Sequence, residues 1–352
     1  MTEANLPLVR RRLLNWYRKN QRDLPWRRSR DPYAIWISET MLQQTQVKTV
    51  LPYYARFLSA FPTVHALARA PLQRVLRLWS GLGYYRRAEN LHKAARLIMR
   101  RHGGIMPREA PQLLALPGVG DYTAGALLSI AFGEQHPAVD GNVRRVLSRL
   151  ALTKSNDEIH AYAAKLVKTS QPGNLNQALM ELGATVCTPK EPRCRGCPVA
   201  SNCRSQSGQQ PAIWQRQKSA SRDVIWPLAI VQRRGRILLR RRRADGLLAK
   251  LWELPGAEIT AAEKAEAVIR QELRPLSVRG LAPQRLGELR HSITNRRIRA
   301  PVLLYRWPVH KSALEDKTDW RWILPTDLHR YATSSMTTKA VRLFIKYETN
   351  PA

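Results

Sequence analysis

The sequence predicts a mainly α-helical domain followed by a smaller α+β domain. Apolar residues recur at helical spacings of three and four through residues 6–204, whereas short alternating or β-branched runs follow residue 224. A polar stretch between the two patterns is typical of a linker. We therefore expect a helical domain over residues 1–205, a linker over residues 206–224 and a second domain over residues 225–352.

The first domain contains several segments with helical periodicity, and Gly or Pro residues mark the turns between them. These segments are residues 35–47, 72–78, 88–99, 124–132, 143–150 and 175–182. In the second domain we expect strands over residues 225–232, 236–240, 301–307 and 320–323. One clear helix is expected among them, over residues 261–273.

The charge of the chain narrows the classes of partner. There are 59 Lys and Arg residues against 26 Asp and Glu, which gives a net charge of +33, while hydrophobic residues make up 44%. The hydrophobic content excludes a disordered basic tail, and no run approaches the roughly 18 apolar residues of a membrane span. The charge indicates a polyanionic partner, and nucleic acid is favoured over an acidic membrane, although a proteome that is basic throughout would give the same excess.

The N-terminus carries no signal-peptide pattern. We therefore expect a cytoplasmic protein in a reducing compartment, which in a bacterium would associate with the nucleoid if its polyanionic partner is DNA. Nothing in the sequence indicates an oligomer, so a monomer is expected.

Cysteine usage predicts a metal centre. The chain has 4 cysteines, all within residues 187–203, with the spacing C-x6-C-x2-C-x5-C. Two disulfides are the plain alternative, and a reducing compartment disfavours them. Structural zinc sites usually contain two C-x2-C pairs, and only one short pair is present here. The spacing therefore favours a single [4Fe–4S] cluster over zinc, held by Cys187, Cys194, Cys197 and Cys203.

A glycine-rich turn predicts contact with a nucleic-acid backbone. The segment L-P-G-V-G, residues 116–120, precedes a stretch with helical periodicity. Glycines at this position let backbone N–H groups approach a phosphate, as in a helix–hairpin–helix. An ordinary helix–helix turn would have a similar sequence, and the charge of the chain favours the DNA-binding interpretation. The residues expected at DNA are Leu116, Gly118, Val119 and Gly120.

Asp140 is the next candidate. It stands in V-D-G-N-V, residues 139–143, where a helix is expected to start, so an N-cap is its simplest role. A helix N-terminus also favours the ionised carboxylate, which could stabilise a developing sugar cation.

Three further motifs join these features. They are W-I-S-E-T-M-L-Q-Q-T-Q-V (residues 36–47), G-L-G-Y-Y (residues 81–85) and L-W-E-L-P-G (residues 251–256). Together with the hairpin, V-D-G-N-V and the cysteine loop, they resemble the MutY-type adenine DNA glycosylases of the endonuclease III, or helix–hairpin–helix, superfamily. The resemblance covers nearly the whole chain. It implies a helix–hairpin–helix glycosylase domain followed by a Nudix-like domain.

The resemblance implies a reaction. Such enzymes act in base excision repair and remove adenine mispaired with 8-oxoguanine or guanine in double-stranded DNA, after the nucleotide has left the base stack. Glu39 matches the general acid that protonates adenine N7, and its apolar neighbours should raise its pKa. Asp140 matches the carboxylate that stabilises the oxocarbenium ion, and Tyr122 and Asn142 match the residues that orient the pair. Without the motif, Glu39 could be a solvent-facing helix residue.

Position 122 indicates the type of glycosylase. Bifunctional relatives carry a lysine there and use its amine to form a Schiff base. Tyr122 therefore implies a monofunctional enzyme that uses water, with no strong lyase activity.

Other matches place residues around the DNA. Gln44 and Tyr84 match residues that wedge into the duplex near the lesion, although both could be ordinary helix-surface or core residues. Arg22, Trp26, Arg27 and Glu181 match residues that line the adenine pocket, although Trp26 could be core.

The second domain departs from its relatives in two ways. It lacks the acidic run of Nudix hydrolases, so a second hydrolytic site is not expected. Where the family carries F-S-H, this chain has Ile293-Thr294-Asn295. These residues keep a hydroxyl and an amide donor for hydrogen bonds to 8-oxoguanine, but the aromatic ring and the imidazole are lost.

Residues 233–243 are rich in arginine. They could form either the solvated face of a hairpin or an added phosphate-binding strip.

Overall fold

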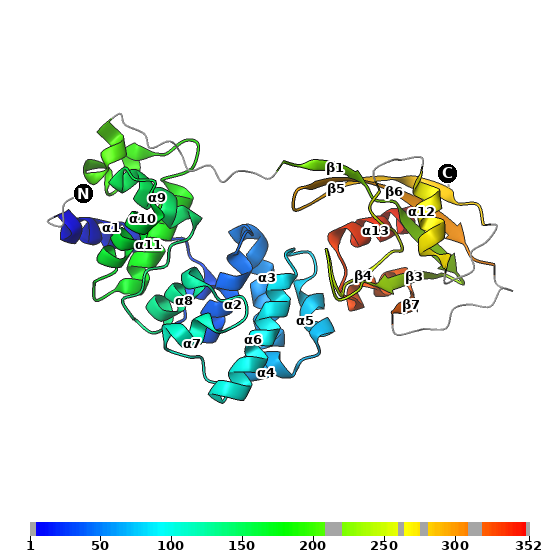
Figure 1. The fold of residues 1–352 in the computed structure, drawn as a ribbon, viewed down its shortest axis with the longest axis horizontal. Coiled ribbons are helices and arrows are strands. Elements are labelled where there is room, and N and C mark those ends of the chain that lie inside the picture. Colours follow the sequence, from blue (N-terminus) through cyan, green and yellow to red (C-terminus); the bar gives the residue numbers. More distant parts are fainter. Residues whose placement is uncertain (1–4, 208–219, 260–263, 275–280, 309–318, 350–352) are drawn as a thin grey trace. The chain divides into compact units, whose positions relative to one another are not determined.

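The computed structural model describes residues 5–207, 220–259, 264–274, 281–308 and 319–349 (Figure 1). Contacts divide the chain into two compact units. The first is Met1–Ala70 with Arg86–Arg216, and the second is Pro71–Tyr85 with Gln217–Ala352. Most of the expected linker, residues 208–219, lies outside the described residues.

The first unit is helical, as predicted. One core cluster of this unit is formed by apolar residues of helices α1, α9, α10 and α11, among them the fully buried Leu13, Val143 and Leu175. The helices are α1 (Leu6–Asn20), α2 (Pro32–Leu42), α3 (Val47–Ala60), α4 (Val64–Arg69), α6 (Arg86–His102), α7 (Ala110–Leu114), α8 (Asp121–Ala126), α9 (Gly141–Ala151), α10 (Asn156–Leu166) and α11 (Pro172–Thr185). None of the described helices is long and apolar enough to span a membrane.

Two expected helices of this unit differ in detail. The continuous helix over residues 35–47 is wrong, because α2 ends at Leu42 and α3 begins at Val47. Gln44 interrupts the helical path with a φ of 57°. The helix expected over residues 124–132 starts earlier, at Asp121, and widens into a π-helical turn over Leu127–Ala131.

The second unit is built on a seven-stranded sheet with the order β1-β6-β2-β3-β4, in which β5 also pairs with β6 and β7 with β3. α12 (Ala265–Glu272) packs through Ile269 on one face, and α13 (Ser335–Thr349) packs through residues such as Phe344 on the other (Figure 1). The strands are β1 (Arg222–Ile225), β2 (Leu228–Arg233), β3 (Arg236–Arg241), β4 (Trp252–Glu253), β5 (Gln284–Ile293), β6 (Arg296–Arg306) and β7 (Trp320–Ile323).

The sequence predicted part of this unit. Strands were correctly expected at β3 and β7, but the expected strand over residues 225–232 is split into β1 and β2 around Pro227, which has no N–H to donate. The expectation of one helix in this unit was wrong, because α13 is a second helix besides α12. The expected helix over residues 261–273 is described only from residue 264 onward.

Residues 71–85, with α5 (Leu72–Trp79) and the G-L-G-Y-Y segment, group with the second unit. Hydrogen bonds to Thr333 explain this grouping. The Tyr85 hydroxyl donates to the Thr333 carbonyl at 3.0 Å, and the Thr333 N–H donates to Ser80 Oγ at 3.2 Å. No local pattern in the sequence indicates this attachment, because the partners are 248 and 253 positions apart.

Candidate active site

Glu39 lies in the middle of α2 and is buried. Asp31 caps the helix by accepting the N–H groups of Tyr33 and Ala34, and only 5% of Glu39 is exposed. The Tyr122 hydroxyl, on α8, donates a hydrogen bond to Glu39 Oε2. Burial raises the pKa of Glu39 to about 7, while the Tyr122 hydrogen bond acts in the opposite direction. The sequence predicted this direction from the apolar neighbours.

Asp140 caps α9, as expected. Its Oδ1 accepts the Val143 N–H at 2.7 Å, and its Oδ2 accepts Asn142 Nδ2 at 3.0 Å. The sequence predicted that the helix N-terminus holds this carboxylate ionised. Burial acts in the opposite direction and raises the pKa of Asp140 overall, and the hydrogen bonds from Val143 and Asn142, which favour the ionised form, offset this only in part.

The two carboxylates interact electrostatically. The charge of Asp140 raises the pKa of Glu39, and the charge of Arg27 lowers it. A site in which one carboxyl is protonated near neutral pH beside a carboxylate is suited to acid-catalysed cleavage of a glycosidic bond.

Two arginines of α9 link the neighbourhood of Asp140 to the cysteine loop through hydrogen bonds. Arg145 Nη2 donates to Asn142 Oδ1 at 2.8 Å, and Arg145 Nε donates to the Cys187 carbonyl at 2.8 Å. One turn on, Arg149 Nη1 approaches Cys187 Sγ at 3.3 Å and donates to the Thr188 carbonyl at 2.7 Å. Neither arginine was predicted from the sequence, although the i, i+4 spacing along α9 places the two on one face.

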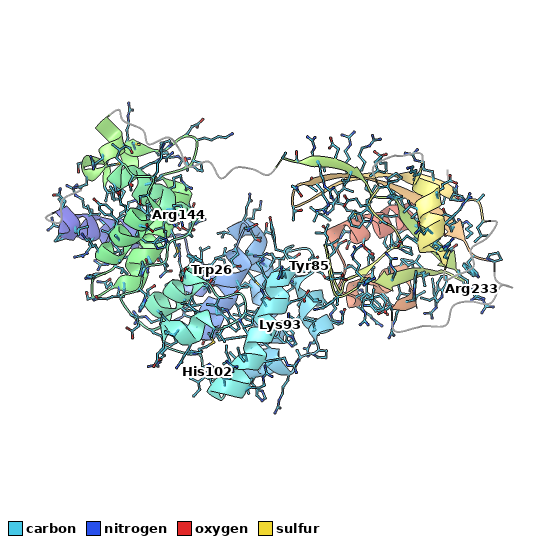
Figure 2. The ribbon with its side chains drawn as sticks, in the orientation of Figure 1. Trp26, Tyr85, Lys93, His102, Arg144 and Arg233 are labelled. Carbon is cyan, nitrogen blue, oxygen red and sulfur yellow. The ribbon has the colours of Figure 1, made fainter. Side chains whose placement is uncertain are left out.

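Glu181 gathers two expected pocket residues. Its Oε1 accepts Arg22 Nε at 2.7 Å, and its Oε2 accepts Arg27 Nη2 at 2.7 Å, while its own side chain is fully buried. Burial raises the pKa of Glu181, but the two guanidinium groups outweigh this and hold it below its usual value. The structure therefore brings these three residues together. Trp26, which Figure 2 labels among the helices of the first unit, is also buried. Its ring lies edge-on to that of Tyr54, with 5.3 Å between the ring centroids.

The expected hairpin lies between α7 and α8. Leu116 and Val119 are buried, so their side chains anchor the turn in the protein. Gly118 has a φ of 81°, and a Cβ there would meet Asn90 at 2.8 Å, so only glycine fits. A Cβ on Gly120 would meet nothing within 4 Å.

The two expected wedge residues share an unusual backbone conformation. Gln44 has a φ of 57° and Tyr84 a φ of 48°, both in the left-handed region that non-glycine residues rarely adopt. Gln44 is exposed, and Tyr84 is 46% exposed. Neither residue therefore lies in the core, which was one of the alternatives to a wedge role.

The four cysteines line one cavity. Apolar side chains such as Leu150, Leu182 and Val199 complete the lining. Within the described residues, no group of three or more His, Cys, Asp or Glu converges closely enough to hold one metal ion. Burial raises the pKa of the Cys197 thiol to about 11.

Thr294 and Asn295 form the two-residue turn between β5 and β6, because Ile293 pairs with Arg296. Thr294 is exposed, has a φ of 54° and donates its hydroxyl to the Ile293 carbonyl at 2.6 Å. The Asn295 carbonyl accepts the Arg222 N–H at 2.8 Å, so the amide side chain is not needed to hold the turn.

The arginine-rich residues 233–243 are largely engaged within the second unit. Arg240 and Arg242 both pair with the buried Glu253, at 3.0 and 2.9 Å, and Arg241 pairs with Asp319 at 2.8 Å. These three arginines already have carboxylate partners in the protein itself, and a phosphate-binding role for the segment stays a prediction.

Comparisons with known proteins support a chain of two domains. The HhH-GPD superfamily of base excision DNA repair proteins matches residues 37–171, and the NUDIX domain matches residues 227–343. The adenine DNA glycosylase of Homo sapiens is 36% identical over 97% of this chain and 74% of its own length. That of Rattus norvegicus is 37% identical over 97% of this chain and 78% of its own length.

Solved structures resemble the helical part. A thermostable thymine-DNA glycosylase aligns with a TM-score of 0.56 and 29% identity, and the alignment covers 58% of this chain and 98% of that one. An endonuclease III in a non-covalent DNA complex aligns with a TM-score of 0.52 and 24% identity, over 59% of this chain and 98% of that one. The second likeness concerns the fold alone.

Proposed function

The chain belongs to the adenine DNA glycosylase family of base excision repair proteins, and we propose that it hydrolyses the N-glycosidic bond of adenine mispaired with 8-oxoguanine or guanine. One observation carries the proposal. Glu39, buried and with a pKa of about 7, shares a site with Asp140, whose charge acts on it.

Glu39 is the general acid in this proposal. A carboxyl with a pKa near 7 is partly protonated at neutral pH, and it can donate its proton to adenine N7 once the base is extruded. The Tyr122 hydroxyl donates to Oε2 and so leaves the other oxygen of Glu39 to carry the proton toward the base.

Asp140 stabilises the sugar cation that forms as the bond breaks, through a transient covalent adduct that water then hydrolyses. Asn142 and the Val143 N–H fix its orientation. Because Asp140 must be ionised and Glu39 protonated, the rate should decline on both sides of a maximum.

Tyr122 makes the enzyme monofunctional. A phenol that donates to a carboxylate cannot form the Schiff base that a lysine amine would form at this position. Water is then the final nucleophile, and the DNA strand stays intact until it is treated with alkali.

The pocket for the extruded adenine is formed by Arg22, Trp26, Arg27 and Glu181. Glu181 holds both guanidinium groups in place. The buried ring of Trp26 would form part of the pocket wall, against which the base stacks. The charge of Arg27 also reaches Glu39, which ties the pocket to the catalytic acid.

Double-stranded DNA is bound through the hairpin and the two wedge residues. The open space at Gly120 and the start of α8 suit a backbone phosphate. Gln44 and Tyr84, both exposed, enter the duplex.

The residues around the cysteine cavity fit a [4Fe–4S] cluster. A single zinc ion would draw four sulfur atoms to about 2.3 Å from one point. Four thiols that surround a cavity with apolar walls instead suit a group of several atoms. Cys187, Cys194, Cys197 and Cys203 would hold the cluster, which would cross-link a loop rich in turns and short 3₁₀ segments.

Thr294 and Asn295 read 8-oxoguanine in the second unit. The Asn295 side chain and the exposed Thr294 stand at the tip of a hairpin, where a base can approach them. The double variant Thr294→Ala/Asn295→Ala should lower the preference for 8-oxoguanine over guanine. Arg234→Ala, in the β2–β3 turn where Arg234 also has a positive φ, is the control. An unchanged preference in the double variant would contradict the proposal that Thr294 and Asn295 recognise 8-oxoguanine.

A substrate panel tests the function itself. Duplexes with A opposite 8-oxoguanine, A opposite G, and T opposite G are incubated with the protein and compared with and without hot alkali. We expect cleavage of the adenine strand only after alkali, and little covalent complex on borohydride trapping. Excision of thymine instead, or abundant trapped complex, would overturn the proposal.

A further inference from the structure

Arg87 stands in the first turn of α6, directly after the G-L-G-Y-Y segment. A cation is unfavourable there, because the N-terminus of a helix carries partial positive charge. The side chain is nonetheless half-buried, so contacts elsewhere must offset this placement.

Those contacts lie at the C-terminal end of α2. Arg87 Nη1 donates to the carbonyl oxygens of Thr40 at 2.9 Å, Met41 at 2.8 Å and Gln43 at 2.5 Å. Arg87 Nη2 donates to Thr45 Oγ1 at 3.0 Å. The final carbonyls of a helix lack intrahelical partners and carry partial negative charge, so a guanidinium group satisfies both needs.

The same contacts bracket Gln44. Arg87 holds the residue before it through the Gln43 carbonyl and the residue after it through the Thr45 hydroxyl. Gln44 itself has a φ of 57°, a strained conformation that residues other than glycine rarely adopt. Such a conformation persists only where its neighbours are fixed.

We propose that Arg87 is a positioning residue that holds Gln44 in the conformation in which it enters the DNA duplex. The inference rests on the proposed wedge role of Gln44. Arg87 touches neither the base nor the catalytic carboxylates in this account, and its loss impairs extrusion of adenine while leaving the proton transfer from Glu39 unaltered.

A lysine cannot replace it. The guanidinium group spreads its donors over a rigid plane and reaches three carbonyls and a hydroxyl, whereas an ammonium group is a compact point charge. Arg87→Lys should therefore be impaired in the same direction as Arg87→Met, while retaining more of the fold.

The experiment measures single-turnover excision by the full-length protein on an A opposite 8-oxoguanine duplex. The proteins are wild type, Gln44→Ala, Arg87→Met, Arg87→Lys, and each Arg87 variant combined with Gln44→Ala. Arg87→Met should slow excision by about 10–100-fold, as small misplacements in active sites do. In the Gln44→Ala background the same change should cost less than about twofold. The pH dependence of the rate should keep its midpoint.

Arg10→Met is the matched control. Arg10 also caps a helix C-terminus, through the carbonyls of Leu166 at 3.0 Å and Lys165 at 2.5 Å, at the end of α10. It should lower the melting temperature comparably and leave the excision rate unchanged.

The failures are distinguishable. If Gln44→Ala leaves the rate unchanged, the wedge assignment fails, and the role of Arg87 fails with it. If Gln44→Ala slows excision but the Arg87 variants slow both backgrounds by the same factor, only the Arg87 inference is overturned. A shifted pH midpoint would likewise overturn it, because Arg87 would then act through Glu39.

Discussion

Two glutamates of the first unit are buried to a similar extent, since Glu39 has 5% and Glu181 has 1% of its surface exposed. Their pKa values nevertheless shift in opposite directions. Burial raises the pKa of Glu39 to about 7. The pKa of Glu181 is held below its usual value, because two guanidinium groups outweigh the same effect of burial. Glu39 has a phenol as its hydrogen-bond partner.

The difference shows that the partner determines which buried carboxyl can act as an acid. A guanidinium group compensates the charge of Glu181, so this residue serves as an anion that holds two arginines. A phenol donates a hydrogen bond but brings no charge, so Glu39 remains protonated up to neutral pH. Arg27 contacts one glutamate directly and lowers the pKa of the other from a distance.

The largest expected effect is on catalysis. Glu39→Gln keeps the size of the side chain but cannot donate the acidic proton, and it should slow single-turnover excision by about 10²–10⁴-fold. In the wild type, the rate should fall about tenfold per pH unit above pH 7, as Glu39 loses its proton. A wild-type rate that is flat from pH 7 to 9 would contradict the assignment of Glu39 as the acid.

The same substitution should stabilise the fold in a defined pH window. The folded-state pKa of about 7 exceeds the usual glutamate pKa of 4.5, so the native state binds the proton more tightly and loses stability as pH rises between these values. Glu39→Gln should therefore raise the free energy of unfolding above pH 7 by up to about 3 kcal/mol. Denaturant titrations should find no gain near pH 4.5, and a gain of equal size at both pH values would contradict this origin.

Glu181→Gln should act in the opposite direction. It leaves Arg27, whose side chain is 11% exposed, without its buried counter-charge, and should lower the free energy of unfolding at pH 7 by about 2–3 kcal/mol. The loss should shrink as pH falls below 4.5, because the wild-type carboxylate then becomes protonated as well. Urea titrations at pH 7 and pH 4 measure the difference.

The smallest expected effect concerns the link between the two glutamates. Arg27→Met removes a positive charge that lowers the pKa of Glu39, so the midpoint of the alkaline decline in rate should move to higher pH. The resulting change in rate at pH 8 should be less than about tenfold after normalisation to the plateau. Arg22→Met is a control, since Arg22 is not among the causes of the Glu39 shift.

The sequence predicted features that depend on neighbouring residues. Asp140 precedes a helix, so its N-cap role follows from local geometry. The apolar neighbours of Glu39 correctly indicated that its pKa is raised. The raised pKa of Asp140 was not predicted, because it depends on how deeply the assembled helices bury the carboxylate.

Hydrogen bonds between residues far apart in the chain could not be predicted from sequence patterns. Nothing near residue 87 indicates that its guanidinium group will hold a turn 44 positions away. Nothing near residue 85 indicates that its hydroxyl will bond to Thr333. Such bonds go to backbone carbonyls, which every residue has, and therefore leave no signal in the sequence of the partner.

The sequence by itself determined the order of the domains, the cysteine spacing and which two carboxylates are the candidates for catalysis, because periodicity, spacing and motifs are local properties of a chain. Only the tertiary structure decided which charged groups face each other. The pKa values of Glu39, Asp140 and Glu181 depend on burial and on the distance to charges from other helices, and folding alone sets both.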